Sequence, residues 1–182
     1  MKKTGLMLFA VIVMMAGVTT SLMAQTSATV TGTAAGAKLI VPMTLTQTSP
    51  LHFGTINLLT GAGGTVVLPS NSTTRTFTGG VVASTVAPVA TNAAYNVTGT
   101  KNVTYALTLP ATITVTETVG GVATMTISGL LARFNGAGAD AIVSTLSATG
   151  TDNFTLGGTL TVAAAQVAGI YAGAFNVTVD YN

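Results

Sequence analysis

Apolar and polar residues alternate with a period of two along much of this chain. The clearest stretch covers residues 175–181, where Phe175, Val177, Val179 and Tyr181 alternate with polar residues. Successive side chains of a β-strand point to opposite faces, so the stretch is predicted to be a strand with one apolar face. It reaches the last residues of the sequence, and Tyr181 is the penultimate one.

Similar alternation predicts strands further upstream. Residues 38–46 are predicted to form one strand, at a sheet edge or with a bulge, because Pro42 lacks an amide donor. Residues 94–97 and 103–109 are predicted to form a hairpin around the turn 98–102.

The pattern as a whole predicts an all-β fold. About nine to eleven short, mostly antiparallel strands are separated by glycine-rich turns, and apolar residues rarely recur at helical spacing. Gly157 and Gly158 interrupt one strand and predict a β-bulge. We therefore expect an immunoglobulin-like β-sandwich.

The N-terminus has the composition of a secretory signal peptide. Lys2 and Lys3 precede an apolar run over residues 6–18, which is too short to span a bilayer, and small residues follow up to Ala24. We expect cleavage after Ala24 or within a few residues of it. The domains are then a signal peptide at 1–24, an N-terminal segment at 25–35 and one domain at 36–182.

This interpretation predicts export, through the periplasm to the cell surface or medium. The remaining 158 residues suffice for one domain with a full core. No later segment has the pattern of a transmembrane helix, so we expect no anchor after cleavage. The chain has no cysteine, so its stability is expected to come from packing and strand pairing without disulfides.

Charged residues are scarce in this chain, and their scarcity excludes some classes of partner. After residue 24, four basic residues balance four acidic ones, giving a net charge of zero. A nucleic-acid partner is not expected, because binding needs a dense basic face. Threonine supplies 33 of the 158 residues, a surface that is polar yet carries little charge to repel its neighbours.

Candidate catalytic chemistry is sparse. His52 is the single histidine and stands opposite Leu51 and Phe53 in the alternation, so it is expected to face solvent. Neither a zinc site nor a serine-type triad can be assembled around one histidine without cysteine or a nucleophile motif. The four acids after residue 24, Glu117, Asp140, Asp152 and Asp180, are scattered. We expect no enzyme activity, no cofactor and no metal site.

Two short motifs carry a resemblance to a known family. They are L-x-F-G at residues 51–54 and G-G-T-L-x-V followed by Q-x-x-G-x-Y-x-G within residues 157–173. With them, the chain resembles the bacterial domain of unknown function 4402. That pattern is similar to the spore coat U and archaic chaperone–usher pilin domains. The position of Gly169, fourteenth from the end, together with the penultimate tyrosine resembles the C-terminal strand motif of the same pilins.

The resemblance implies an immunoglobulin-like domain that lacks one strand. In such pilins a chaperone first covers the open groove, and the N-terminal extension of another subunit then fills it. The implied partners are like subunits in a fibre and, in addition, a periplasmic chaperone and an outer-membrane usher. The implied partner interface is the C-terminal strand, with Gly169, Phe175, Val177, Val179 and Tyr181.

The segment 25–35 is the candidate donor strand. Small residues, Ala28, Val30, Gly32 and Ala34, alternate in it with threonines. The alternative is that this segment is the first strand of its own domain. We therefore expect a secreted structural subunit of a surface fibre, and a secreted monomeric adhesin or ligand-binding module remains the alternative.

Overall fold

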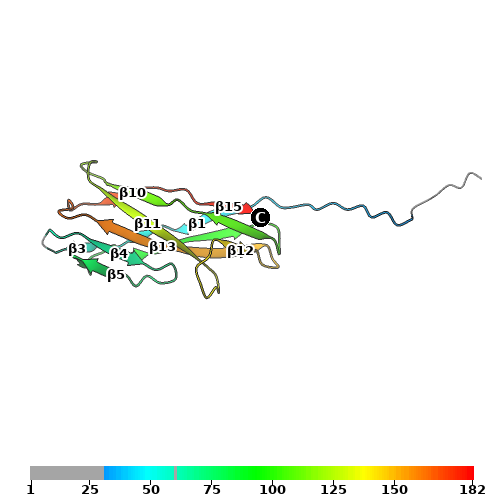
Figure 1. Ribbon diagram of the computed structural model, residues 1–182, viewed down its shortest axis with the longest axis horizontal. Helices are drawn as coiled ribbons and strands as arrows, with labels where there is room; N and C mark the ends of the chain where they lie inside the picture. Colours follow the sequence, from blue (N-terminus) through cyan, green and yellow to red (C-terminus); the bar gives the residue numbers. More distant parts are fainter. Residues whose placement is uncertain (1–30, 60) are drawn as a thin grey trace, which may run out of the picture. The chain divides into compact units, whose positions relative to one another are not determined.

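The computed structural model describes residues 31–59 and 61–182, and it divides into the units Met1–Lys38 and Leu39–Asn182. We call the second unit the sandwich body. Figure 1 shows its strands, which are β1 (Thr44–Ser49), β2 (His52–Phe53), β3 (Ile56–Leu58), β4 (Gly64–Leu68), β5 (Thr76–Gly79), β6 (Val81–Ala83), β7 (Ala90–Thr91), β8 (Ala93–Thr98), β9 (Thr104–Thr108), β10 (Thr112–Glu117), β11 (Thr124–Phe134), β12 (Val143–Thr145), β13 (Thr151–Val162), β14 (Tyr171–Ala172) and β15 (Thr178–Tyr181).

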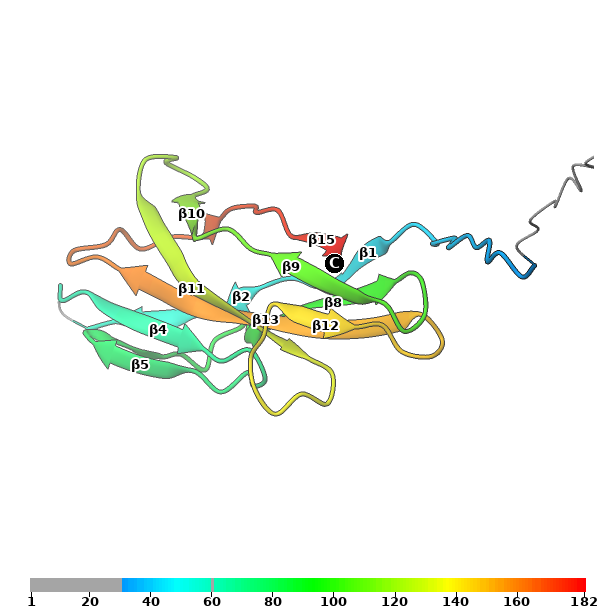
Figure 2. The same cartoon turned by 45° about the vertical axis from the view of Figure 1, so that its right-hand side comes forward.

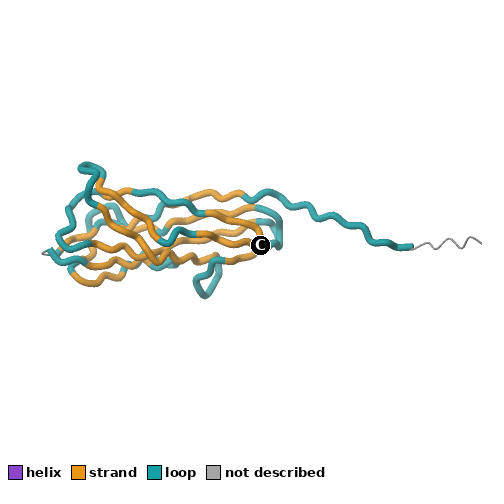
Figure 3. Tube along the Cα trace, turned by 45° about the horizontal axis from the view of Figure 1, so that its top comes forward, coloured by secondary structure: helices purple, strands orange, loops and turns teal. Residues whose placement is uncertain are grey.

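The fold class predicted from the sequence is confirmed. The described residues contain no helix, and their strands pair in antiparallel sheets of a sandwich-like arrangement (Figure 3). They include fifteen strands, more than predicted, because several pairings of two or three residues carry too little sequence pattern to be read as strands. No helix among the described residues could cross a membrane.

The large sheet is built around β13. Its eight strands follow the order β1-β8-β13-β11-β10-β14, with β4 also pairing with β13 and β5 pairing with β4. One edge of β13 is shared, because Thr151–Leu156 pair with β8 while Gly158–Val162 pair with β4. The chain changes partner at Gly157, where a Cβ would collide with the backbone of Leu68, Pro69 and Ser70.

The predicted bulge exists, but on the neighbouring strand. The β11–β13 register slips between Ser128 and Leu131, so the extra residue belongs to β11, where Gly129 and Leu130 stand opposite the single residue Gly158 of β13. Gly129 has a φ of 59°, a conformation that glycine adopts without the steric cost of a side chain. The prediction therefore gave the right position for the irregular pairing but placed the extra residue on β13 instead of β11.

The predicted hairpin of residues 94–109 is wrong. β8 pairs with β1 and β13 in the large sheet, whereas β9 lies in a three-stranded sheet of order β12-β9-β15. Alternation places one face of each strand in the core but does not select a partner strand. The turn between them therefore crosses from one sheet to the other, and Val97 and Tyr105 face the same core.

The core has two clusters. One lies between the large sheet and the β12-β9-β15 sheet and contains the buried aromatic residues Tyr95, Tyr105, Phe134 and Phe154. Tyr95 stacks on Phe154 with ring centroids 5.0 Å apart, and Phe134 meets Phe154 edge-on at 5.5 Å. The second cluster is aliphatic apart from Phe53 and lies mainly under β4, β10, β11 and the second half of β13.

Candidate functional site: two open strand edges

The last strand is paired along one edge only. β15 pairs with β9, from Thr178 opposite Thr108 to Tyr181 opposite Tyr105, and no other strand of the described chain pairs with it. Its apolar residues Val179 and Tyr181 pack against the aromatic core cluster yet remain only partly buried. A strand in the middle of a sheet buries the same kind of residue completely, so this side of the core is incompletely covered.

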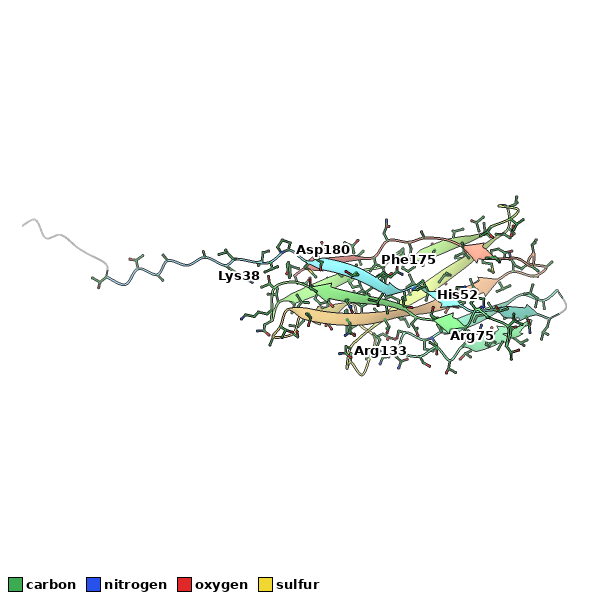
Figure 4. All side chains as sticks on the ribbon, turned by 180° about the vertical axis from the view of Figure 1, so that it is seen from behind. Lys38, His52, Arg75, Arg133, Phe175 and Asp180 are labelled. Atoms are coloured by element: carbon green, nitrogen blue, oxygen red, sulfur yellow. The ribbon has the colours of Figure 1, made fainter. Side chains whose placement is uncertain are left out.

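The strand is shorter than its sequence pattern predicted. Residues 173–177 have no strand structure, and Phe175 and Val177 lie in this lead-in segment, partly buried against the core. The physical reason lies in the partner, because continued pairing beyond Thr108 would meet Pro110, which has no amide donor. Figure 4 shows Phe175 in this segment and Asp180 further along the chain.

The first strand of the body is also paired along one edge. β1 pairs with β8, from Thr44 opposite Thr98 to Ser49 opposite Ala94. The predicted strand at 38–46 is thus displaced, since it begins only after Pro42 and extends to Ser49. Leu45 and the preceding Met43 pack, partly buried, against the same core cluster as β15, whereas Leu39 and Val41 are exposed.

Tyr181 links the two strands at one end of the body. Its hydroxyl donates to the Val41 carbonyl at 2.6 Å and accepts from the Thr100 amide at 2.6 Å. The Val41 amide donates to the Thr100 hydroxyl oxygen, also at 2.6 Å. Gly99 has no side chain, and a Cβ there would collide with the Tyr181 hydroxyl. The penultimate tyrosine thus marks the point where β1 begins and β15 ends (Figure 2).

Other strands also end their sheets, but with a different environment. β5, β12 and β14 contain two to four residues each, and short edges of this kind are a common protection against unwanted pairing. β1 and β15 differ from them because both pack partly buried apolar side chains on the aromatic core cluster, whereas Phe77 of β5 packs on the aliphatic one. The two strands form what we call the open-edge site.

The candidate donor residues fall partly within the described chain. Gly32 and Ala34 are exposed and belong to no strand, whereas Ala28 and Val30 lie outside the described residues. Within residues 31–35 the segment is therefore not a strand of its own domain in this structure.

Gly169 lies apart from the strand to which the sequence analysis attached it. It packs on Glu117, and a Cβ at Gly169 would lie 2.8 Å from the Glu117 Cγ. The Glu117 carboxylate accepts from the amide of Val119 at 2.9 Å and from that of Gly120. These bonds, first the one from Gly120, hold the pKa of Glu117 below its ordinary value. Glu117 thus stabilises the β10–β11 turn, and Gly169 leaves the space that its side chain occupies.

The remaining polar candidates serve separate local structures. His52 Nδ1 accepts from the Gly54 amide at 2.8 Å, and Asp152 accepts from the Tyr105 hydroxyl at 3.0 Å. Arg133 Nε lies 2.8 Å from Asp140, and this ion pair, with a hydrogen bond from Ser70, lowers the pKa of Asp140. Figure 4 shows His52, Arg133 and Asp180 well apart. Within the described residues, no three potential metal ligands of the His, Cys, Asp or Glu type gather.

One polar hollow adjoins β8, the strand that pairs with β1. It has a volume of about 580 Å³ and is lined mainly by short polar side chains from β8, β12, β13 and the adjoining turns, among them Asn96, Ser144 and Asp152. The hollow is open, and none of its lining residues is aromatic.

The fold and the site together define a sandwich-like all-β protein whose first and last body strands are each paired on one edge. The chain belongs to the family described as Domain of unknown function (DUF4402), whose model matches residues 43–181. No curated protein matches the chain. The match begins after the candidate donor segment and includes both strands of the open-edge site.

The structure gives a physical role to the L-x-F-G motif. Gly54 has a φ of 71°, and a Cβ there would lie 2.8 Å from the Ala90 amide nitrogen. Arg75 donates to the carbonyls of Phe53 at 2.6 Å and Thr55 at 2.9 Å, and it stacks over the Phe77 ring. Sequence reasoning missed Arg75, because nothing near it in the sequence indicates the backbone that it binds.

Proposed function

We propose that this protein is an exported structural subunit of a surface fibre. In the proposed assembly, the N-terminal segment 25–35 of one copy adds a strand to the open-edge site of another copy. Added strands bind through main-chain hydrogen bonds, while alternate side chains enter the apolar face of the acceptor. The mechanism is binding and assembly, and it requires no catalytic residue.

The observation that carries the proposal is the state of β1 and β15. Each has one edge without a strand partner in the described chain, and the apolar side chains beside those edges are only partly buried. Burying apolar area is favourable by about 25 cal/mol per Å². A further strand at this place would add both the missing main-chain bonds and the missing cover.

The candidate donor matches this acceptor in length and in side-chain size. Eleven residues in a strand span about 36 Å, which is enough to cover the four residues of β15, about 13 Å at the same rise, together with the segment before them. The core beneath is already filled by large side chains. Small residues at alternate positions, Ala28, Val30, Gly32 and Ala34, suit the shallow space that remains.

The family resemblance supports factors for export and assembly, and the open edge gives a physical reason for one of them. An unpaired apolar edge invites aggregation, so a subunit of this kind needs temporary cover before it assembles. We propose a periplasmic chaperone for that cover, an outer-membrane usher for assembly, and the cell surface as the destination. The signal-peptide pattern at residues 1–24 supports export.

The test compares two neighbouring charges in the donor segment. Val30→Asp places a carboxylate on the face that enters the acceptor, and burying an unpaired ion costs several kcal/mol. Thr31→Asp adds the same charge on the opposite face and serves as the control. We expect Val30→Asp to be exported but absent from heat-resistant, high-molecular-weight species on a gel, while Thr31→Asp assembles.

A second variant separates assembly from folding. Val177→Asp charges a residue that packs on the subunit's own core, so we expect it to prevent folding rather than assembly alone. The proposal is wrong if the wild type sediments as a monomer and deletion of residues 25–35 unfolds it. That result would make the segment a strand of its own domain.

The monomeric adhesin is the second candidate, and the polar hollow beside Asp152 supports it. Its amide and hydroxyl side chains could bind a hydroxyl-rich ligand such as a glycan. A monomer that binds a glycan array, and loses the binding on Asn96→Ala with its circular dichroism unchanged, would favour this candidate.

A further inference from the structure

One end of the sandwich body displays aliphatic side chains to solvent. This far end comprises the β10–β11 turn, residues 118–123, and the segment 163–170. Their four large apolar residues, Val119, Val122, Val167 and Ile170, are between 57% and 91% exposed. Neither segment contains a charged residue. Contiguous apolar surface of this kind commonly marks an interaction site.

The two far-end segments are tied together. The Thr118 amide donates to the Ile170 carbonyl at 2.8 Å, and Gln166 Nε2 donates to the Thr124 carbonyl at 3.2 Å. The Tyr171 hydroxyl donates to the Val167 carbonyl at 2.6 Å. The exposed side chains therefore stand on a hydrogen-bonded platform.

The opposite end of the body carries a second exposed aliphatic group. Leu39, Ile40 and Val41 are between 55% and 86% exposed and follow one another directly before β1. Thr100 and Tyr181 hold the backbone of Val41 at this end. The ends are separated by the length of β13, whose twelve residues span about 40 Å.

The directions of β1 and β15 determine at which end of an acceptor the body of the donating copy would lie. β1 begins at the Tyr181 end and β15 finishes there, so the two strands run in opposite directions. A donor parallel to β15 would leave the site at the Tyr181 end. The acceptor's own N-terminal segment also leaves the acceptor at the Tyr181 end. The copy that donates to the acceptor and the copy that receives the acceptor's segment would then both have to lie at this one end.

A donor antiparallel to β15 gives each end one neighbour. It leaves the site at the far end, beside Tyr171 and Gly173, and the body of the donating copy follows there. Only three residues lie between Ala35 and Leu39, and the four Cα-to-Cα steps reach at most about 14 Å. The residues 39–41 of that copy must then lie close to the far end of the acceptor.

We infer that Leu39, Ile40 and Val41 of one copy pack against the far-end residues of the next copy, forming an apolar seam between successive bodies. The inference rests on the proposed fibre function and adds a second contact to the inserted strand. The contact joins two different surfaces, so it repeats along a chain instead of closing a dimer. The residues named on both surfaces are uncharged, so burying their side chains leaves no ion unpaired among them.

Cross-linking tests the seam directly, because the natural chain contains no cysteine. The full-length variant carrying Ile40→Cys and Val122→Cys is exported, and the assembled protein is treated with a short bismaleimide. The control carries Ile40→Cys and Val143→Cys, since Val143 is exposed on β12, away from the far end. We expect a covalent ladder of multimers at least about tenfold stronger for the seam pair.

The outcomes distinguish the seam from the strand addition. Heat-resistant multimers that form without preferential cross-linking at Ile40 and Val122 overturn the seam and leave the strand addition intact. Cross-links between two Ile40→Cys copies, with none to Val122→Cys, also overturn it. If the wild type forms no multimers at all, the fibre function fails and the seam fails with it.

Discussion

β13 and β15 share an alternating sequence pattern but differ in their surroundings. β13 is paired along both edges, and its inward residues Phe154, Leu156, Leu160 and Val162 are all buried. β15 is paired along one edge, and its inward residues remain partly exposed. The comparison teaches that one pattern occurs in two environments: β13 completes the core of its own chain, whereas β15 leaves its side of the core only partly covered.

The largest expected effect is in β13. Leu156→Ala removes a fully buried side chain between the two sheets, and leucine truncations in cores cost about 2–5 kcal/mol of unfolding free energy. Val179→Ala in β15 should cost less than half as much, because Val179 is partly exposed. Urea denaturation of the unassembled Val30→Asp background measures both; equal losses would remove the distinction between the strands.

The next effect is the gain in stability expected when a peptide covers the unpaired edge of β15. A synthetic peptide of residues 25–35 should stabilise the Val30→Asp protein, because it binds the folded state only. At one hundred times its dissociation constant, a ligand adds about 2.7 kcal/mol, which calorimetry detects as a higher melting temperature. The same peptide with Val30→Asp is the control, and a wild-type peptide without effect at millimolar concentration contradicts the open-edge site.

A smaller effect on stability is expected from the far-end turn, which lies apart from the open edges and depends on Glu117. The pKa of Glu117 lies below its ordinary value of 4.5, so the folded state favours its charged form. The resulting stability is present above the unfolded pKa and is lost as the pH falls through the folded value. Asp140 contributes in the same direction.

Glu117→Gln should therefore lower the melting temperature at pH 7 and flatten, without abolishing, its decline towards pH 3. Melting curves across that range give the comparison, with Asp180→Asn on β15 as a matched loss of one carboxylate. An unchanged acid decline in Glu117→Gln would show that the turn does not depend on this carboxylate.

The smallest expected effect is at His52. His52→Ala removes the acceptor for the Gly54 amide, a bond worth about 1 kcal/mol. Assembly and every other activity should persist, because the side chain is exposed and belongs to β2, outside the two strands of the open-edge site. Loss of assembly in His52→Ala, with circular dichroism unchanged, would contradict a purely local role.

Much of the fold followed from local pattern. Alternation predicted the all-β class, the strand around Tyr105 and the one-sided C-terminal strand, because side-chain direction in a strand depends only on residue parity. Glycine spacing also located the irregular pairing near Gly157. The alternation alone placed Phe175, Val177, Val179 and Tyr181 on one apolar face, and the family resemblance added the expectation that this face meets a partner.

Pairing between strands was beyond the reach of the pattern. Residues 94–109 alternate as a hairpin does, yet β8 and β9 belong to different sheets. Gly169, close to the last strand in sequence, packs on the β10–β11 turn instead. Such partners are chosen by contacts between residues far apart in the chain, which neither parity nor spacing encodes.

The sequence by itself determined, within most strands, which face turns inward, and it determined how little charge covers the outside. It did so because hydropathy and strand periodicity act residue by residue. Only the tertiary structure decided that β1 and β15 meet at Tyr181, each with one edge unpaired. An open edge is a property of the whole arrangement of strands, because an edge stays unpaired only where no other strand of the described chain pairs with it.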